Sequence, residues 1–475
     1  MTYIRSLPKN DGTLSNTTML LWSFATAFFP RLFTYFGAPA ILNFVHFGIV
    51  PIAAAITLWT SRVRDRRQVR VAQDLLWAMG ILLGVMITSA IINQASVVNV
   101  FLYFMFLAEP MMLMAALMMV EMVGERLEKF RKWVVGFAFF NLFLVVVQSI
   151  LMPIGIYPRR GGTLQDNIAG VFASGGGSAG NYVSATVSFY FALYFLQTFK
   201  NVPLWIRVST ILLSLYQLQV SDSKQTLATF LAGGVLLVIT KLKRPGKFIG
   251  YLIVAVIVLY LLYWAYQNLQ EVPFVQHIRN WAERDGLYAP DGEGTQTKLA
   301  AFRIIPTHYK SVLNVLFGLG PGHSVSRLGG WVLRDYESLL IPLGATVHPA
   351  SAEVFRVVSD GWVAQQSTIF FPLFTWAGIW GDLGWLGLAA YLYMGWIVWS
   401  RVCVDDFGRF VVLSTVVLGF ILTQMEEPGQ MLTAACLLAL RWHEHNNQAR
   451  KVPSAPRPTG VAQYEHNFLD NVNSG

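Results

Sequence analysis

Long apolar stretches separated by short polar segments dominate this chain. A helix that crosses a bilayer needs about 20 mostly apolar residues. Backbone groups in lipid must form hydrogen bonds within their own segment, so each apolar stretch predicts a helix. The pattern therefore predicts an all-α polytopic membrane protein with about 12 transmembrane helices. The apolar ranges are 18–36, 40–60, 72–91, 98–122, 133–156, 181–199, 204–220, 225–240, 248–267, 371–400, 410–424 and 428–440.

One long polar insertion separates the ninth predicted helix from the tenth. It contains the polar stretch ERDGLYAPDGEGTQTK and the stretch LAAFRIIPTHYKSVLNVLFG, whose helical spacing is interrupted by Pro306. Structureless loops of this length are uncommon, so the insertion indicates function. The predicted parts are transmembrane helices 1–9 (1–267), a large periplasmic loop (268–370), transmembrane helices 10–12 (371–441) and a disordered cytoplasmic tail (442–475), which is polar and Pro-rich.

Charge and composition fix the predicted orientation. Only 13% of the residues are charged and 55% are apolar, about half the charged share that is usual in a soluble domain. Of the 35 Lys and Arg residues, 23 fall in segments that are all cytoplasmic when the N-terminus is cytoplasmic, including 62–70, 124–132 and 241–247. The positive-inside rule then places both termini in the cytoplasm and the long loop outside. The net charge of +9 is thereby explained without nucleic-acid binding.

Two features limit the alternatives. The two cysteines, Cys403 and Cys436, both lie in or beside predicted transmembrane helices, which excludes a disulfide framework or a CxxC metal site. The first residues, MTYIRSLPKND, are polar and lack a short apolar core with a cleavage site, so we expect no cleaved signal peptide.

A few basic residues lie on the predicted outer side, where the positive-inside rule does not explain them. They come from three separate loops, and one loop also contains the glycine-rich segment GLGPGHS (318–324). Arginine forks bind phosphate oxygens, lysine adds a point charge, and glycine-rich turns can aim backbone amides at an anion. We expect these groups to converge on one anion, although each alone is also typical of a solvated or headgroup contact. They are Arg159, Arg160, Lys224, Arg303 and Arg327.

Four histidines lie on the predicted outer side. None has metal-ligand spacing with a partner, so the sequence predicts no zinc site. Each could act as a general base near neutral pH, and His323 and His348 are the leading candidates. The four are His277, His308, His323 and His348.

Acidic residues give weaker signals. Glu109 precedes Pro110 inside the fourth predicted helix, and a carboxylate within the membrane is a functional hypothesis, although it is equally compatible with protonation or bonding at the proline kink. Asp382, near the outer end of the tenth predicted helix, is interpreted as a helix cap or a site residue. We interpret Glu426 and Glu427, in the turn MEEPGQ, as solvated.

Several of these segments, in this order, resemble the O-antigen ligase and polymerase superfamily, which includes polymerases of bacterial exopolysaccharides. The matching segments are RRGGTLQDN and GGGSAGNYVSA (within 159–185), VSDSKQTLATFLAGG (220–234), VLNVLFGLGPGHS (312–324) and FTWAGIWGDLGWLGLAAYLY (374–393). Arg303 stands where the family usually has an Arg, and Lys224 replaces another. The family often has a His shortly before the last segment, where this chain has AQQSTIFFPLF, and this departure leaves the catalytic base open.

The resemblance implies glycosyl transfer at the periplasmic face of the bacterial cell inner membrane. The donor would be an oligosaccharide on undecaprenyl diphosphate, and the acceptor a sugar hydroxyl on another lipid-linked repeat unit. Membrane lipids, a chain-length regulator and export proteins are the implied partners; no metal, other cofactor or nucleic acid is implied. The catalytic residues would be His348 or Glu353 as the base, with Arg303. The diphosphate ligands would be Arg159, Arg160, Lys224, Arg327 and His323.

Three alternatives remain. An O-antigen ligase would transfer the glycan to lipid A core, and the absent His favours a polymerase over that ligase. A transporter or flippase of lipid-linked glycans would need charges along a path through the bilayer, where this sequence has almost only Glu109. A scaffold or sensor that binds a partner through the loop would not need Lys224 and Arg160 beside the membrane surface.

Overall fold

The computed structural model describes residues 15–173, 179–243, 245–284 and 286–451, and every regular element in them is a helix. Six helices in these ranges are long and apolar enough to cross a membrane. This confirms the all-helical prediction and indicates a membrane protein. The six are Ala40–Thr60, Arg66–Asn93, Val97–Met118, Gly124–Leu151, Phe248–Asn268 and Thr368–Val402.

Each of the predicted apolar ranges contains a helix. The first range is divided at Pro30, which starts a new helix because proline cannot donate to the preceding turn. The helices are α1 (Asn16–Phe28), α2 (Pro30–Tyr35), α3 (His46–Thr60), α4 (Arg66–Asn93), α5 (Val97–Met118), α6 (Gly124–Leu151), α8 (Gly180–Thr198), α9 (Leu204–Val220), α10 (Lys224–Ile239), α11 (Pro245–Asn268), α20 (Thr375–Ile397), α21 (Asp406–Leu418) and α22 (Pro428–Lys451).

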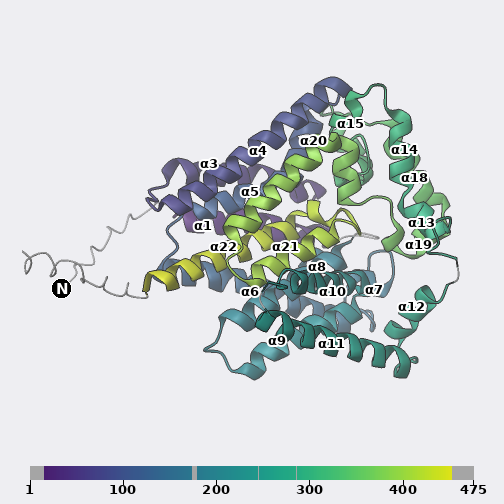
Figure 1. Ribbon diagram of the computed structural model, residues 1–475. Helices are drawn as coiled ribbons and strands as arrows, with labels where there is room; N and C mark the ends of the chain where they lie inside the picture. The colour runs from purple at the N-terminus through teal and green to yellow at the C-terminus, as the bar shows by residue number, and fades with distance from the viewer. Residues whose placement is uncertain (1–14, 174–178, 244, 285, 452–475) are drawn as a thin grey trace, which may run out of the picture.

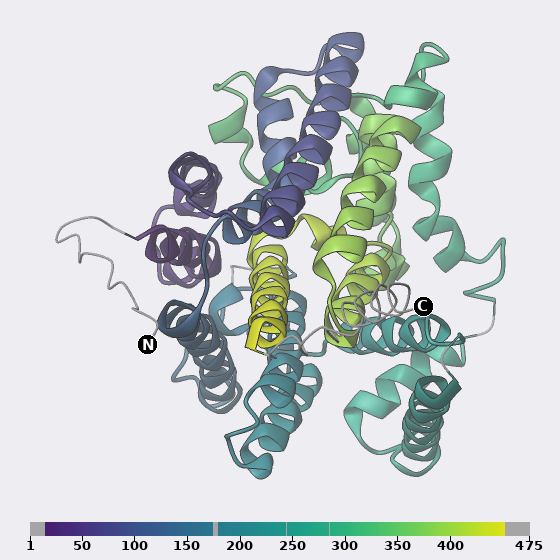
Figure 2. The same ribbon diagram turned by 60° about the vertical axis from the view of Figure 1, so that its left-hand side comes forward.

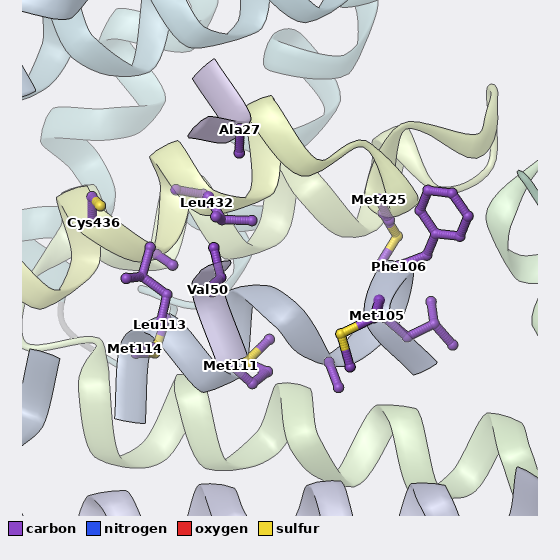
Figure 3. Close-up of a cluster of buried hydrophobic side chains, with 14 of the residues drawn as sticks. Ala27, Val50, Met105, Phe106, Met111, Leu113, Met114, Met425, Leu432 and Cys436 are labelled. Carbon is purple, nitrogen blue, oxygen red and sulfur yellow. The ribbon is translucent and has the colours of Figure 1, made fainter. Parts of the chain in front are cut away.

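Helices α5 and α22 form the centre of the bundle. They pack against each other, and α22 also contacts α1, α6 and α8, as the central yellow helix of Figure 2 shows. In the 18-residue apolar stretch of α5, 83% of the residues are buried inside the protein. In the corresponding stretch of α11, none are. A helix that is apolar on all sides suits a central position. Methionine and leucine side chains of α5 interlock with α22 in the core (Figure 3).

Residues 268–370 fold into short helices at one end of the bundle (Figure 1), which we call the loop end. Pro306 interrupts the helical spacing as predicted, because a 3-10 turn over Ile305–His308 follows α14 there. The helices are α12 (Pro273–Ala282), α13 (Glu293–Lys298), α14 (Ala300–Ile304), α15 (Leu313–Phe317), α16 (Leu333–Asp335), α17 (Glu337–Leu340), α18 (Pro349–Asp360) and α19 (Trp362–Gln366).

The last helix extends beyond its predicted end at residue 441, so the predicted start of the disordered tail is wrong. Helix α22 continues to Lys451 at what we call the tail end of the bundle. Trp442 Nε1 donates to the carbonyl of Arg401 (3.1 Å), and Asn447 Nδ2 donates to the carbonyl of Met122 (2.7 Å). These contacts hold a polar segment in helical form. The rest of the predicted tail, 452–475, and the N-terminal residues 1–14 lie outside the described residues.

Candidate functional site

The glycine-rich segment 318–324 packs against helix α20 and encloses the carboxylate of Asp382. The amide of Gly322 donates to Asp382 Oδ2 (2.9 Å), and that of Ser324 donates to Oδ1 (2.6 Å). The amide of Gly320 donates to the backbone carbonyl of Asp382 (3.0 Å). The expectation that this turn aims its amides at an external anion is therefore wrong, because those amides bind an internal carboxylate.

Two glycines permit this close packing. Gly318 has φ +70°, and a Cβ there would lie 2.3 Å from the carbonyl carbon of Asp382. Gly384 interrupts α20 with φ +64°, and a Cβ there would lie 2.4 Å from the backbone of Leu316. Only glycine tolerates both the positive φ and the contact. The segment thus fixes the loop on α20 and sets the position of the residues that follow it.

Arg327 follows this segment and lies in a cluster with Arg31 and Glu427. Arg31 Nη2 is 2.6 Å from Glu427 Oε1, and Arg327 Nη2 is 2.5 Å from Glu427 Oε2. The two arginine side chains are 17% and 19% exposed. The interpretation of Glu426 and Glu427 as solvated is wrong, since they are 0% and 3% exposed. Burial raises the pKa of Glu426 to about 8, and Glu427 forms the ion pairs with both arginines.

Histidines and a carboxylate form a second cluster at the loop end. His308 Nε2 lies 2.8 Å from Glu353 Oε2, and Glu353 is half-exposed. The ring of His348 lies between those of His308 and His323, with both centroid distances at 5.4 Å. His323 is buried, with Nδ1 on the carbonyl of Leu319 and Nε2 on Thr346 Oγ1. Its position does not support the predicted diphosphate contact.

The geometry favours Glu353 over His348 as the base. His348 Nδ1 accepts the amide hydrogen of Ala350 (3.2 Å), so the neutral ring carries its proton on Nε2 and can only donate there. Burial, together with the neighbouring His323, His308 and Lys310, lowers the pKa of His348 to about 4. Glu353 keeps an exposed carboxylate that can accept a proton.

Two of the other predicted cations, Arg303 and Lys224, contact neighbours in their own segments. Arg303 Nη2 donates to the carbonyl of Gln296 (2.6 Å). Lys224 forms an ion pair with Asp222. Arg159 and Arg160 are both exposed. The convergence of these residues on one anion stays a prediction.

Two hydrogen bonds connect helices α8 and α10 to the loop. Tyr182 Oη on α8 lies 3.1 Å from Thr368 Oγ1, and Gln225 Nε2, beside Lys224, donates to the same hydroxyl. Arg160 Cζ lies 5.5 Å from the ring centroid of Tyr35, one helical turn after Arg31 on α2. The segment with Lys224 therefore meets the loop, and Arg160 meets α2.

The structure also shows a buried histidine–glutamate pair inside the bundle that the sequence did not predict. His46 Nδ1 lies 2.8 Å from Glu109 Oε1, and both residues are buried. A histidine at the start of a long apolar range was the available signal for this pair. Within the described ranges, no group of three or more His, Cys, Asp or Glu is placed to hold a metal ion. The side chain of His277 and residues 175–178 of the segment GGGSAG lie outside the described residues.

No protein-family model matches this chain, and no curated protein matches it. The resemblance to the O-antigen ligase and polymerase superfamily accordingly depends on the short motifs and their order alone.

Proposed function

We propose that this chain polymerises polysaccharide repeat units by glycosyl transfer at the periplasmic face of the bacterial cell inner membrane. In this proposal about 12 helices cross the membrane, both termini are cytoplasmic and the loop end faces the periplasm. The donor is an undecaprenyl-diphosphate-linked oligosaccharide, and the acceptor is a sugar hydroxyl of another lipid-linked unit.

One observation carries the proposal: an exposed proton acceptor and an arginine pair occupy the same end of the bundle. Ser351 Oγ on α18 donates to the carbonyl of Gly329 (2.7 Å). This bond ties the helix that carries Glu353 to the segment that begins at Arg327. A transfer to a hydroxyl with a diphosphate leaving group needs these two kinds of group near each other.

The proposed reaction assigns a role to each group. The acceptor hydroxyl oxygen attacks the anomeric carbon of the donor sugar while the bond from that carbon to the diphosphate oxygen breaks. Glu353 takes the hydroxyl proton, and His308 orients its carboxylate through the 2.8 Å contact. Arginine and lysine side chains stabilise the charge that develops on the lipid diphosphate. Arg327 and, as the resemblance implies, Lys224 and Arg303 supply that charge.

The ligase and the flippase remain the alternatives. The ligase differs only in its acceptor, lipid A core. The flippase is favoured by one observation, the buried His46–Glu109 pair inside the bundle, because ionisable pairs at such positions often mark transport paths.

The test substitutes Glu353→Gln in cells, with Glu337→Gln as the matched control, since Glu337 is an exposed glutamate of the same loop. We expect Glu353→Gln to lower polymer formation by about 100-fold or more, as for loss of a general base, and single lipid-linked units to accumulate on the outer face. Normal chains in Glu353→Gln would contradict the proposed base. Units that accumulate on the inner face would instead support the flippase.

A further inference from the structure

A polar cavity lies at the tail end of the bundle, at the opposite end from the residues assigned above to glycosyl transfer. Its volume is about 310 Å³. It lies between the segment that precedes α4, the connection from α5 to α6, and the last turns of α22. It is separate from the ion pairs that Arg441 forms nearby, since no partner of Arg441 lines it. Its polar lining residues are Arg64, Asp65, Gln68, Glu121, His443 and Asn447.

Hydrogen bonds from α22 fix one wall of this cavity. Asn447 Nδ2 donates to the carbonyl of Met122 (2.7 Å), and His443 Nε2 lies 3.0 Å from the carbonyl of Leu117. Both carbonyls belong to the end of α5 and the connection that follows it. The wall is therefore formed before any ligand binds, which lowers the entropy that binding must lose.

One buried side chain of the cavity has unused hydrogen-bonding capacity. Gln68 on α4 is 5% exposed and lines the cavity. Within the part of the chain that the structure describes, its side-chain amide forms no hydrogen bond. Buried polar atoms in folded proteins are nearly always bonded. Gln68 therefore offers both a donor and an acceptor to a molecule in the cavity.

The charges of the lining select the kind of ligand. One guanidinium group and two carboxylates line the cavity, from Arg64, Asp65 and Glu121. Arg64 and Glu121 are exposed, so the cavity is open to solvent, and neither forms an ion pair with another described residue. A purely anionic ligand would meet two carboxylates, and a simple amine would leave Arg64 unpaired. A ligand with one ammonium group and one anionic group complements all three charges.

We propose that this cavity binds a small zwitterion. Its ammonium group lies beside Asp65 and Glu121, its anionic group lies beside Arg64, and its remaining polar atoms bond to Gln68. Free amino acids and the headgroups of ethanolamine lipids both have this chemistry. The proposal does not depend on glycosyl transfer, because no residue of the cavity takes part in that reaction.

Saturation-transfer NMR titrations of the full-length protein in detergent measure the affinity of soluble probes. The zwitterions are γ-aminobutyrate, for a free solute, and glycerophosphoethanolamine, for a lipid headgroup; butylamine and butyrate each carry only one of the two charges. We expect the better zwitterion to bind at least about 5-fold more tightly than butylamine or butyrate. Which zwitterion binds more tightly identifies the source of the ligand. Equal affinities for the zwitterions and butylamine, or no binding of any probe, would overturn the proposal.

Matched variants assign the two charges of the ligand. Arg64→Gln should weaken the zwitterion about 5-fold and leave butylamine unchanged, because it removes only the partner of the anionic group. Its control is Arg62→Gln, an exposed arginine of the same segment that does not line the cavity. Glu121→Gln should weaken both probes, and its control is Glu125→Gln, an exposed glutamate outside the lining. Equal effects of a variant and its control would show that the probe binds elsewhere.

Gln68 separates a binding role from a structural one. Gln68→Leu keeps a side chain of similar size and removes the amide, so we expect the zwitterion to bind about 5-fold more weakly. The melting temperature should not fall, because this amide has no described hydrogen-bond partner to lose. A lower melting temperature with unchanged affinity would make Gln68 a structural residue and would contradict the proposed site.

Discussion

Ion clusters occupy both ends of the helix bundle, and they differ in how their buried carboxylates are bonded. At the tail end, both oxygens of Glu444 accept hydrogen bonds, Oε1 from Tyr194 Oη (2.6 Å) and Oε2 from Arg441 Nη1 (2.8 Å). Arg441 Nε also donates to Asp405 Oδ2 (2.9 Å). At the loop end, Glu426 has one buried oxygen with no partner among the described residues.

This difference distinguishes a cluster that stabilises the fold from one that can bind a ligand. A buried carboxylate whose two oxygens are both bonded fixes the positions of the helices around it, and the removal of one partner leaves the others unpaired. A cluster with unused donors and acceptors keeps a cost that a ligand can remove. We therefore expect changes at the tail end to alter stability, and changes at the loop end to alter binding and turnover.

The largest effect is expected at the tail end. Arg441→Ala leaves Asp405 and Glu444 without their main partner and should lower the free energy of unfolding by about 3–5 kcal/mol. Arg409→Ala is the matched control, because Arg409 is more exposed and its contact with Asp406 is long, at 4.0 Å. Thermal unfolding in detergent measures both variants. Equal losses in the two would remove the distinction between the ends.

The second-largest effect on stability is expected at the hydrogen bonds to the carboxylate of Asp382. Asp382→Asn replaces one charged acceptor oxygen with an amide group that cannot accept from Gly322 or Ser324, so we expect a loss of about 1–3 kcal/mol. The segment 318–324 should then exchange its amide hydrogens faster. Hydrogen exchange by mass spectrometry follows this segment, and unchanged protection would show that Asp382 does not hold it.

Arg31→Ala should have a smaller effect on stability than Arg441→Ala and a clear effect on function. We expect polymer formation to fall by about 10-fold, which corresponds to about 1.4 kcal/mol of lost interaction. Arg356→Ala, an exposed arginine of the same end, is the control. A loss of stability as large as that in Arg441→Ala, with normal polymer from the remaining protein, would make the two ends alike.

The pH dependence of stability gives the smallest effect. His348 has a pKa lowered to about 4 in the folded protein, against about 6.5 in an unfolded chain. The unfolded state therefore binds more protons between these values, and stability should fall as pH decreases from 6.5 to 4. His348→Asn can still cap α18 through Oδ1 and should flatten this part of the curve. The melting temperature between pH 4 and 8 tests this, and identical slopes would contradict it.

Apolar periodicity predicted the helices well because most of them are buried by or embedded in apolar surroundings. It failed where polar residues are held by distant contacts. The end of α22 is polar in sequence, yet it is helical because Trp442 and Asn447 bond to the carbonyls of Arg401 and Met122. No local pattern encodes such partners.

The site was harder to predict, for the same reason. Charge on the predicted outer side identified Arg327, and its partner Glu427 lies a hundred residues further along the chain. Arg31 is a lone cation inside the apolar range 18–36, which is also typical of a headgroup contact. The glycines were recognised as a turn, but only the structure shows that their amides bind Asp382.

Reconstitution tests the central proposal most directly. The purified protein is placed in vesicles with lipid-linked single repeat units and EDTA, and products are followed by mass spectrometry. We predict longer lipid-linked chains together with free polyprenyl diphosphate, formed without a divalent metal. Units that stay single, or that only cross the bilayer intact, would contradict the proposal that this chain forms glycosidic bonds.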